Sequence, residues 1–587
     1  MTDYNNKNFI AAIVLSMLII FGWQYFYAGP IAEKAKKQAE ATQTTTTTAV
    51  VPGAIPPAAA TREQALGSGP RLKIETPELQ GSVNLTGAQL DDLHLSNYRE
   101  TIDPASPTIV LLSPAGSPNA FFAEQGLVGA TGTTAKLPDS KTVWSAPADA
   151  VLGVGKPVTL TWDNGGGLVF SRQIAIDDKY VFSVTQSVQN NTAAPVAVIP
   201  YARIQRQDTP KISGYWVFYE GMLGFLGDKL QEVKYKDVAG AKEPTRVDSQ
   251  GGWVGFTDKY WAATLIPDQT RAITTSFQHQ LQDNRDVYQT DYLAKDAIIV
   301  QPGGKGLYQD QLFAGAKVVK TIQAIGEKYQ IKKFDLMIDW GWFEFITKPM
   351  FYLLEFIKGI VGNFGIAILI ATVLVKLAVF PLANKSYASM SKMKKLQPEI
   401  QKLKELYPDD KAKQQQGMME LYKREKVSPI SGCLPVLVQV PVFFSLYKVI
   451  LTSIELRHAP FYGWIHDLSA PDPTNFFTLF GTIAWSPPAL LHLGIWPFLM
   501  GITMWVQMRL NPAPPDPVQA SLFNWMPVMF TFMLGSFPVG LVIYWAWSNS
   551  LSILQQSVIM KRHGTDFDLF GNIRDSLPFT KKKTPLT

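Results

Sequence analysis

The chain has 587 residues, of which 47% are hydrophobic and 17% are charged, and its formal net charge is +6. This length excludes a single domain, and so mild a charge says little before it is placed along the chain. Cys433 is the only cysteine. A disulfide within the chain is therefore excluded, and any soluble part must be held together by its own core.

Hydrophobic residues concentrate in separate stretches. The six stretches are 9–27, 364–382, 430–451, 491–508, 522–537 and 539–559. Because about 20 apolar residues cross the hydrocarbon core of a bilayer, we predict a polytopic α-helical membrane protein with six transmembrane helices. The fifth stretch is short, at about 16 residues, so we expect the bilayer to thin beside it.

Positively charged residues orient these helices, because short loops rich in lysine and arginine stay in the cytoplasm. The loop 384–427 holds ten lysines and Arg424 against six acidic residues, whereas 453–490 carries only four charged side chains. We therefore expect both termini in the cytoplasm and residues 29–362 outside it. One local signal opposes this orientation, since Lys34, Lys36 and Lys37 follow the first stretch on its outer side. Long domains, however, are translocated largely regardless of their charge.

Residues 1–30 are predicted to form an uncleaved transmembrane anchor. A cleavage site needs small residues, whereas this stretch ends in aromatic residues between Trp23 and Tyr27, which suit the edge of a membrane. Residues 31–70 contain the run Thr44–Thr48 and a part rich in proline and alanine. Such a composition cannot build a core, so we predict a disordered tether.

Residues 71–332 are predicted to form an all-β domain. Segments 158–162, 168–176 and 180–188 are short and alternating, and turns such as Asp163–Gly167 join them. This pattern is typical of a β-sandwich.

The β domain offers no evident catalytic or metal site. His94 and His279 lack the spacing of metal ligands. Trp216, Trp253 and Trp261 could form a sugar-binding face, but aromatic residues at strand spacing are more often core, and we predict core.

Residues 333–362 are aromatic but too charged to cross a membrane, since they include Glu344, Lys348, Glu355 and Lys358. We predict an amphipathic helix that lies along the outer membrane surface.

Residues 384–428 are predicted to form a cytoplasmic helical hairpin. Its apolar seam comprises Met393, Leu396, Ile400, Leu403 and Tyr407 before a turn at Pro408–Asp410, and Met418, Met419 and Tyr422 after it. The seam is either the packing of the hairpin itself or an adaptable, methionine-rich docking surface. Both interpretations stay open.

Lys376 is a lone cation inside the second apolar stretch. A charge at the centre of a helix in lipid costs roughly 2.5–3.5 kcal/mol, so such residues usually face a bundle interior or a wet cavity. The alternative is that the side chain extends to the membrane surface. Side chains lean toward the N-terminus of a helix, here away from the nearer surface, so we favour a functional site.

The polar residues inside the predicted helices gather in their cytoplasmic halves. They include Thr372, Gln439, Ser548, Asn549 and Ser552, while the outer halves are nearly all apolar. A pore would need polar groups at every depth. This distribution predicts a wet cavity that opens to the cytoplasm and is closed on the outer side.

Three segments resemble the YidC membrane protein insertase family of Gram-negative bacteria. They are MMELYKREKVSPISGCLPVLVQVPVFFSLY (Met418–Tyr447), ELRHAPFYGWIHDLSAPDP (Glu455–Pro473) and FPVGLVIYWAWSN (Phe537–Asn549). The resemblance implies a five-helix insertase core, formed by the second helix at 363–383 and four more within 429–560. It also implies an outer β-supersandwich like that of sugar mutarotases, with no cofactor and no covalent catalytic site.

The resemblance also implies site residues. The family's groove has a positive residue, usually arginine, where this chain has Lys376, and an aromatic residue, usually tyrosine, at Trp545. The implied groove comprises Lys376, Thr372, Gln439, Tyr544, Trp545, Ser548, Asn549 and Ser552, and we expect a hydrophobic slide at Val436, Val440, Pro441, Met526, Phe530 and Met533. The segment 474–490 is longer than the family pattern, and we expect it at the outer interface.

The implied function is insertion and folding of membrane proteins in the bacterial inner membrane, alone or with the Sec translocon and its accessory subunits. The implied partners are nascent membrane proteins, the lipid bilayer, and a ribosome contacted by the hairpin and the basic tail 561–587. An ion-coupled transporter is the alternative, but it should show an acidic partner for Lys376, and the predicted helices contain no Asp or Glu. A sugar enzyme would need an acid and base in the β domain.

Overall fold

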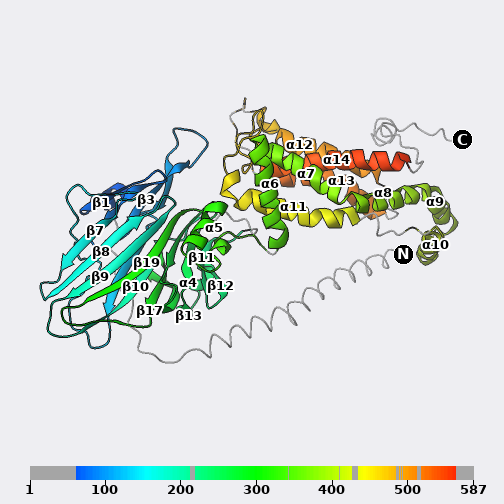
Figure 1. Cartoon of the computed structure of the whole chain (residues 1–587). Helices are drawn as coiled ribbons and strands as arrows, with labels where there is room; N and C mark the ends of the chain where they lie inside the picture. The colour runs from blue at the N-terminus through cyan, green and yellow to red at the C-terminus, as the bar shows by residue number, and fades with distance from the viewer. Residues whose placement is uncertain are drawn as a thin grey trace. The chain divides into compact units, whose positions relative to one another are not determined.

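The computed structural model of the chain describes residues 61–562, apart from 212–217, 342, 409, 426, 428–433, 481, 484, 486, 487, 489, 490, 492 and 512–516. The predicted anchor 1–30, most of the predicted tether, Trp216 and nearly all of the basic tail therefore lie outside the described residues. Within them, a β domain is followed in the chain by a helical region (Figure 1).

Two antiparallel sheets build the β domain, apart from one parallel pair between β1 and β6. The first sheet has 11 strands, in the order β13 (Thr245–Gln250), β16 (Ala272–Gln282), β17 (Arg285–Ala294), β10 (Val196–Gln207), β5 (Phe121–Gly129), β3 (Gln89–Arg99), β2 (Leu79–Asn84), β1 (Arg71–Glu75) and β6 (Val151–Leu152), with β18 (Ile298–Val300) beside β10 and β4 (Thr108–Leu112) beside β3. The second sheet has 8 strands, in the order β12 (Lys229–Val233), β11 (Gly221–Leu226), β14 (Trp253–Thr257), β15 (Trp261–Ile266), β19 (Lys305–Ala316), β9 (Val181–Asn190), β8 (Leu168–Ile176) and β7 (Val158–Asp163).

The strands predicted from alternation are confirmed in β7, β8 and β9. Along β8, every second residue is buried, because successive side chains of a strand point to opposite faces of the sheet. The turn between β7 and β8 is held by Asn164, whose Oδ1 accepts from the N–H groups of Gly166 and Leu168 at 2.7 and 3.0 Å. Gly165 and Gly167 supply the positive φ angles that this turn requires.

The predicted core role of the tryptophans is confirmed for Trp253. It is fully buried, its ring packs edge-on against Phe334 at 5.7 Å, and its Nε1 donates to the main-chain oxygen of Lys332 at 3.2 Å. Trp261 is only half-buried and lies at the start of β15. The core of the domain includes Phe334 and Met337 and thus extends past the predicted boundary at residue 332.

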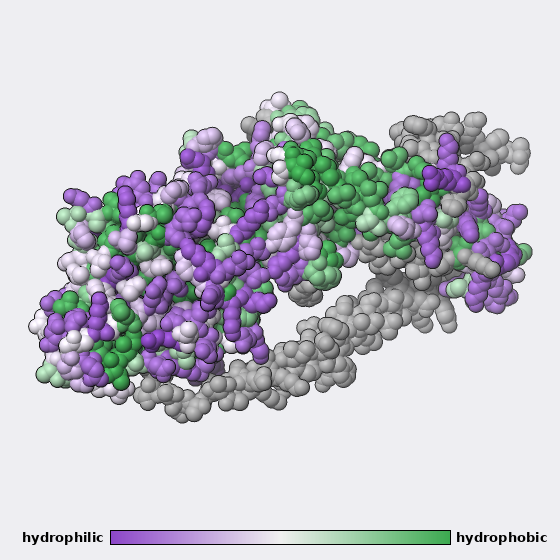
Figure 2. Space-filling model, viewed as in Figure 1, coloured by the Kyte–Doolittle hydropathy of each residue, from purple (hydrophilic) through white to green (hydrophobic). Residues whose placement is uncertain are grey.

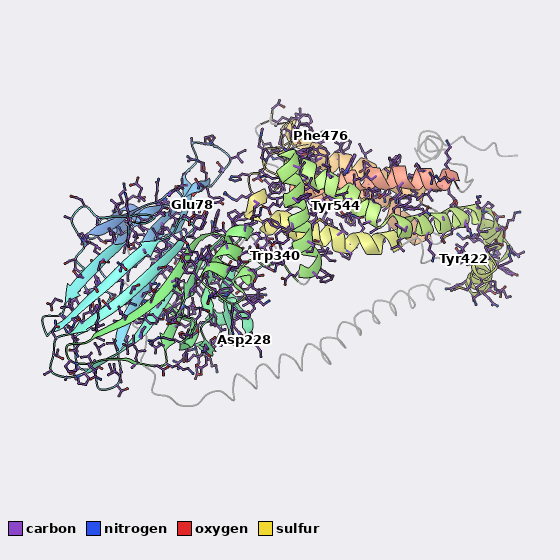
Figure 3. The ribbon with its side chains drawn as sticks, viewed as in Figure 1. Glu78, Asp228, Trp340, Tyr422, Phe476 and Tyr544 are labelled. Atoms are coloured by element: carbon purple, nitrogen blue, oxygen red, sulfur yellow. The ribbon has the colours of Figure 1, made fainter. Side chains whose placement is uncertain are left out.

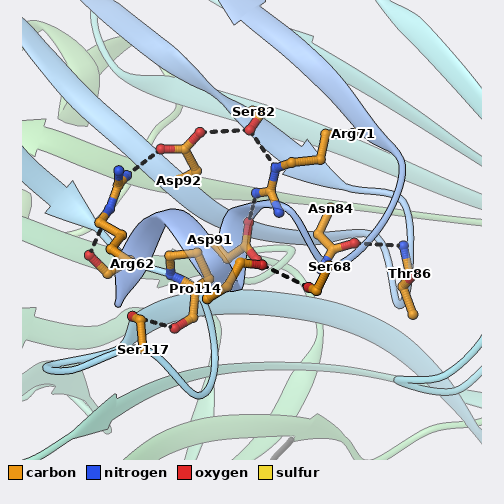
Figure 4. A network of polar contacts seen from close by, with 12 residues as sticks. Arg62, Ser68, Arg71, Ser82, Asn84, Thr86, Asp91, Asp92, Pro114 and Ser117 are labelled. Carbon is orange, nitrogen blue, oxygen red and sulfur yellow. Dashed lines mark hydrogen bonds and ion pairs between the residues drawn. The ribbon is translucent and has the colours of Figure 1, made fainter. Parts of the chain in front are cut away.

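The prediction of a disordered tether up to residue 70 is wrong for its last ten residues. Residues Arg62–Leu66 form a short helix, α3, whose N-terminus carries a capping box from Thr61. Arg62 pairs with Asp92 on β3, and Ser82 links Asp92 at 2.6 Å to Arg71 at 2.7 Å (Figure 4). Because these partners lie far from Arg62 in sequence, local composition could not reveal them.

The predicted interfacial helix is divided into two elements. A short 3-10 helix, η2 (Phe334–Met337), precedes α6 (Glu344–Val361). Between them, Asp339 accepts from the N–H of Gly341 at 2.9 Å, and Gly341 has a positive φ angle. One face of α6 is buried, whereas its Phe345 and Phe356 are 73% and 69% exposed.

Among the described residues, two small helices besides α3 belong to the β domain, and eight helices follow α6 in the chain. The first two are α4 (Tyr235–Ala239) and α5 (Val319–Lys328). The others are α7 (Phe364–Ala378), α8 (Phe380–Lys395), α9 (Gln397–Leu406), α10 (Lys411–Arg424), α11 (Leu434–Thr452), α12 (Ile495–Leu510), α13 (Pro517–Met533) and α14 (Val539–Arg562). Short 3-10 turns lie at Ile454–Leu456 (η4), Phe476–Thr478 (η5) and Leu534–Ser536 (η7).

Length and hydropathy alone do not single out any one described helix as a membrane span. The bent pair of α7 and α8 meets both criteria together, and Gln439–Thr452 is a shorter apolar helix. The second predicted span was expected to run straight to Leu382, but α7 ends at Ala378 and α8 turns away by 68°. Pro381 explains the break, since proline lacks an N–H and is tolerated in the first turn of a new helix.

The segment predicted to form a helical hairpin contains the end of α8 and the two helices α9 and α10. Leu396, Ile400, Leu421 and Val427 form its small core, with Met393, Met418 and Tyr422 packed against them. Met419 is 49% exposed. The seam therefore serves the packing of the hairpin, while Met419 is left on its surface.

Candidate functional site

Lys376 lies near the C-terminal end of α7, and its side chain reaches α14. Its Nζ donates to Ser552 Oγ at 2.7 Å, and Ser552 Oγ donates to the main-chain oxygen of Ser548 at 2.9 Å. Both serines are buried, whereas Lys376 is half-buried. The ammonium group thus has a polar partner on a neighbouring helix, which lowers the cost of placing its charge among apolar residues.

Tyr387 on α8 joins the same cluster, although the sequence did not single it out. Its hydroxyl group interacts with the side chain of Ser552. The residue is buried and packs with Ala383, Met390 and Ile559. An aromatic residue within a cationic segment was the available signal, but only the bend at Pro381 brings it to α14.

Gln439 on α11 meets Tyr544 on α14. Gln439 Nε2 donates to the hydroxyl oxygen of Tyr544, which is buried among the helices (Figure 3). The hydroxyl group of Tyr544 also interacts with the side chain of Ser548 one turn further along α14. Two of the predicted groove residues therefore connect through Ser548 to the cluster around Lys376.

Further polar contacts join α14 to α12. Asn549 Nδ2 donates to Thr503 Oγ1 at 3.4 Å, and Gln556 Nε2 donates to Asn511 Oδ1 at 3.2 Å. Together with the contacts above, they form what we call the polar cluster: Lys376, Tyr387, Gln439, Thr503, Asn511, Tyr544, Ser548, Asn549, Ser552 and Gln556. Polar contacts among these side chains join four helices and α8, as buried polar groups require, although Gln556 Oε1 is buried without a hydrogen-bond partner.

Thr372 does not join the polar cluster. Its Oγ1 donates to the main-chain oxygen of Ile368 on its own helix at 2.6 Å. It borders a small cavity lined by Met350, Ile368, Ala371, Thr372, Val375, Val442, Leu446 and Tyr544. Hydroxyl groups of Thr372 and Tyr544 are the polar side-chain groups of this lining, which is otherwise apolar.

Trp545 lies beside the predicted hydrophobic slide. Its ring is 4.7 Å from Phe443 on α11 and 5.7 Å from Phe530 on α13. Of the slide residues, Val440 and Met533 are 43% and 44% exposed, and Pro441, Met526 and Phe530 are half-buried. Val436 lies in α11, but its side chain is outside the description.

On the other side of Tyr544, apolar side chains fill the space between the helices. This part lies toward the C-terminal end of α11 and the N-terminal end of α14. Val449 and Val542 are fully buried there. Tyr447 stacks between Phe443 and Phe537, with ring centroids 6.0 and 5.5 Å away. We call this part, with Leu446, Tyr447, Val449, Ile450, Leu541 and Val542, the apolar seal.

Two family models match consecutive parts of the chain. The YidC periplasmic domain matches residues 71–353, and the 60Kd inner membrane protein matches residues 356–566. The matched models thus describe an inner membrane protein with a periplasmic domain.

Curated relatives match over the whole length. The membrane protein insertase YidC of Bradyrhizobium diazoefficiens is 50% identical over 622 residues, covering 100% of both chains, and that of Rhizobium meliloti is 50% identical with 99% of each chain covered. A solved structure of an active YidC insertase is similar at 18% identity and a TM-score of 0.34, covering 85% of this chain and 94% of that one. The chain belongs to the YidC membrane protein insertase family.

Proposed function

We propose that this chain inserts membrane proteins into the bacterial inner membrane, with the polar cluster as the binding site for the polar part of the substrate. In this proposal α7, α11, α12, α13 and α14 form a five-helix core that spans the membrane, and the anchor 1–30 adds a sixth span. The β domain lies in the periplasm, and both termini lie in the cytoplasm, as does the hairpin of α9 and α10.

The apolar exterior of the helical region supports its place in the membrane. Large apolar side chains gather over α6 and α7, whereas the hairpin of α9 and α10 is mostly polar (Figure 2). Exposed members of this surface are Phe345, Phe356 and Ile360 on α6, Leu374 and Leu377 on α7, Leu499 and Ile502 on α12, and Leu522, Trp525, Val528 and Met529 on α13. Contiguous apolar surface of this kind is unusual on a soluble protein and suits contact with lipid.

The polar cluster supplies what a translocating polar segment needs. A substrate tail that enters lipid loses its hydrogen bonds to water, which costs several kilocalories per mole for each unpaired group. Gln439, Ser552 and their neighbours offer replacement donors and acceptors, and water would enter from the cytoplasmic side as they separate. Lys376 then attracts acidic residues of the tail, because charge attraction strengthens where water is scarce.

The exposed slide residues provide the exit. Val440 and Met533 present apolar surface on α11 and α13, and Phe530 continues it inward to Trp545. A substrate helix that leaves along this surface keeps its apolar side chains away from the polar cluster. The slide therefore separates the polar and apolar parts of the substrate without a covalent step or a cofactor.

The proposed partners follow from the same arrangement. Nascent membrane proteins and lipid contact the core, and the Sec translocon with its accessory subunits meets it within the membrane. The hairpin and the basic tail 561–587 are proposed to contact the ribosome, whose RNA is negatively charged.

The observation that carries the proposal is the hydrogen bond from Lys376 to Ser552 inside a helical region whose exterior is apolar. Purified protein in liposomes tests it. We expect a small membrane protein to become protease-protected in its inserted form, with no ion flux across the same vesicles. Ion flux without insertion would favour a transporter.

A further inference from the structure

The loop that follows α11 makes specific contacts with the β domain. Glu455, in the 3-10 turn η4, accepts through Oε1 from the N–H of Val319 at 2.9 Å. Val319 is the first residue of α5, and its N-cap residue, Val318, has no side-chain cap. Because the first N–H groups of a helix lack partners within it, Glu455 caps α5 from a distant part of the chain.

Arg457 makes a second contact two residues later. Its guanidinium group lies over the rings of Trp261 and Tyr260, 5.1 and 5.7 Å from their centroids. Its Nη2 donates to the main-chain oxygens of Arg99 and Glu100 at 2.6 and 3.2 Å. A planar guanidinium group suits this combination of stacking and paired hydrogen bonds, which a lysine could not reproduce.

A third contact links α11 itself to the end of the β domain. Lys448 is buried, and its Nζ lies 2.6 Å from Asp339 Oδ2. The same oxygen accepts from the N–H of Tyr219 at 2.8 Å. Next to this pair, Trp340, which is labelled in Figure 3, packs edge-on against Phe351 of α6 with ring centroids 5.5 Å apart. Buried apolar residues therefore continue from the β domain to α6 and α11.

We infer that Glu455 and Arg457 form a docking surface for the β domain, and that this docking holds the outer end of α11 in place and keeps the apolar seal closed. The contacts reach separate parts of the β domain: the start of α5, the aromatic pair Tyr260 and Trp261 at the start of β15, and the main chain at the end of β3. Burial also raises the pKa of Glu455 to about 7, consistent with water being excluded where the two parts meet. The β domain thus acts as a fixed support for α11. It does so even though the long N-terminal segment 1–60 precedes this domain in the chain.

The docking does not depend on the proposed insertase function, and only its consequence for insertion does. Val449 and Ile450 of the seal lie one turn before Ser453, where the docking loop starts. A shift of that loop would therefore be transmitted to the seal through the last turn of α11.

Electron paramagnetic resonance on the full chain tests the docking directly. Spin labels at Asp228→Cys in the β domain and Ile360→Cys at the end of α6, with Cys433→Ser to clear the background, report the distance between the two parts. We expect a narrow distribution in the parent and a broad one after combined Glu455→Ala and Arg457→Ala substitution. We also expect about tenfold faster hydrogen exchange at the start of α5 in that variant, because its cap is lost.

Arg509→Ala is the matched control, because it removes a similar cation–aromatic pair, Arg509 over Trp505 at 5.3 Å, away from the docking surface. It should change neither readout. The single variant Arg457→Lys keeps the test valid if the double variant fails to fold. We expect it to broaden the distribution of distances between the spin labels, but less than the double variant does. A narrow distribution in both Arg457 variants, with unchanged exchange at the start of α5 in the double variant, would overturn the inference, whatever happens to insertion.

Discussion

Replacing Lys376 with alanine should lower the rate of insertion about tenfold or more for substrates whose translocated tail is acidic. The reason is that the substitution removes the cation of the polar cluster and leaves Ser552 without its donor. Lys376→Arg keeps the positive charge and should preserve insertion. The measurement is protease protection of such a substrate, in proteoliposomes that contain equal amounts of each variant.

Two further variants separate the effect of the charge on Lys376 from two other effects: that of its hydrogen bond and that of the protein's net charge. Ser552→Ala keeps Lys376 but removes its acceptor, and we expect a smaller loss of about twofold to threefold. Lys385→Ala removes an exposed lysine on α8 and should leave insertion unchanged. Insertion by Lys376→Ala at the parent rate, with acidic-tailed substrates, would refute the attraction of substrate by this charge.

Gly501→Leu should destabilise the helical region and impair insertion together. A Cβ atom at Gly501 on α12 would lie 2.1 Å from Thr531 Oγ1 on α13, so a larger side chain must push the two helices apart. Overpacking of this kind costs typically 1–3 kcal/mol. Because α13 also carries Phe530 and Met533, its displacement would move the slide. Pulse proteolysis in denaturant should report the lower free energy of unfolding.

Gly359→Leu is the matched control for that substitution. A Cβ atom at Gly359 on α6 would meet no atom within 4 Å, so no helix has to move. Stability and insertion should stay close to the parent values. Equal proteolysis midpoints for the two leucine variants would contradict the close packing of α12 on α13.

Periodic elements of this chain could be predicted from its sequence, because their cause is local. Alternating burial in β8 follows from the alternating residues of 168–176, and the seam of α9 follows from helical spacing. The bend after α7 has a local cause too, since Pro381 stops a helix, but the apolar composition of the stretch masked it. Composition averages over a window, whereas a helix end depends on one residue.

The contacts within the candidate site could not be predicted from the sequence. Lys376 and Ser552 were both expected in the groove, and the structure adds that they are bonded to each other. Tyr387 was missed, because its approach to Ser552 depends on the turn of α8. Glu455 capping α5 is of the same kind, since the two groups are 136 residues apart and follow no sequence period.

The arrangement of the polar cluster and the apolar seal is tested most directly by the reactivity of single cysteines with a water-soluble thiol reagent. Cys433 is first replaced by serine. Gln439→Cys and Gln507→Cys, both half-buried on the side of the polar cluster, should react with reagent added from the cytoplasm. Val449→Cys and Val542→Cys, in the fully buried seal, should react from neither side. Labelling of both valine positions from the periplasm would reveal a continuous water path and contradict a core that opens only to the cytoplasm.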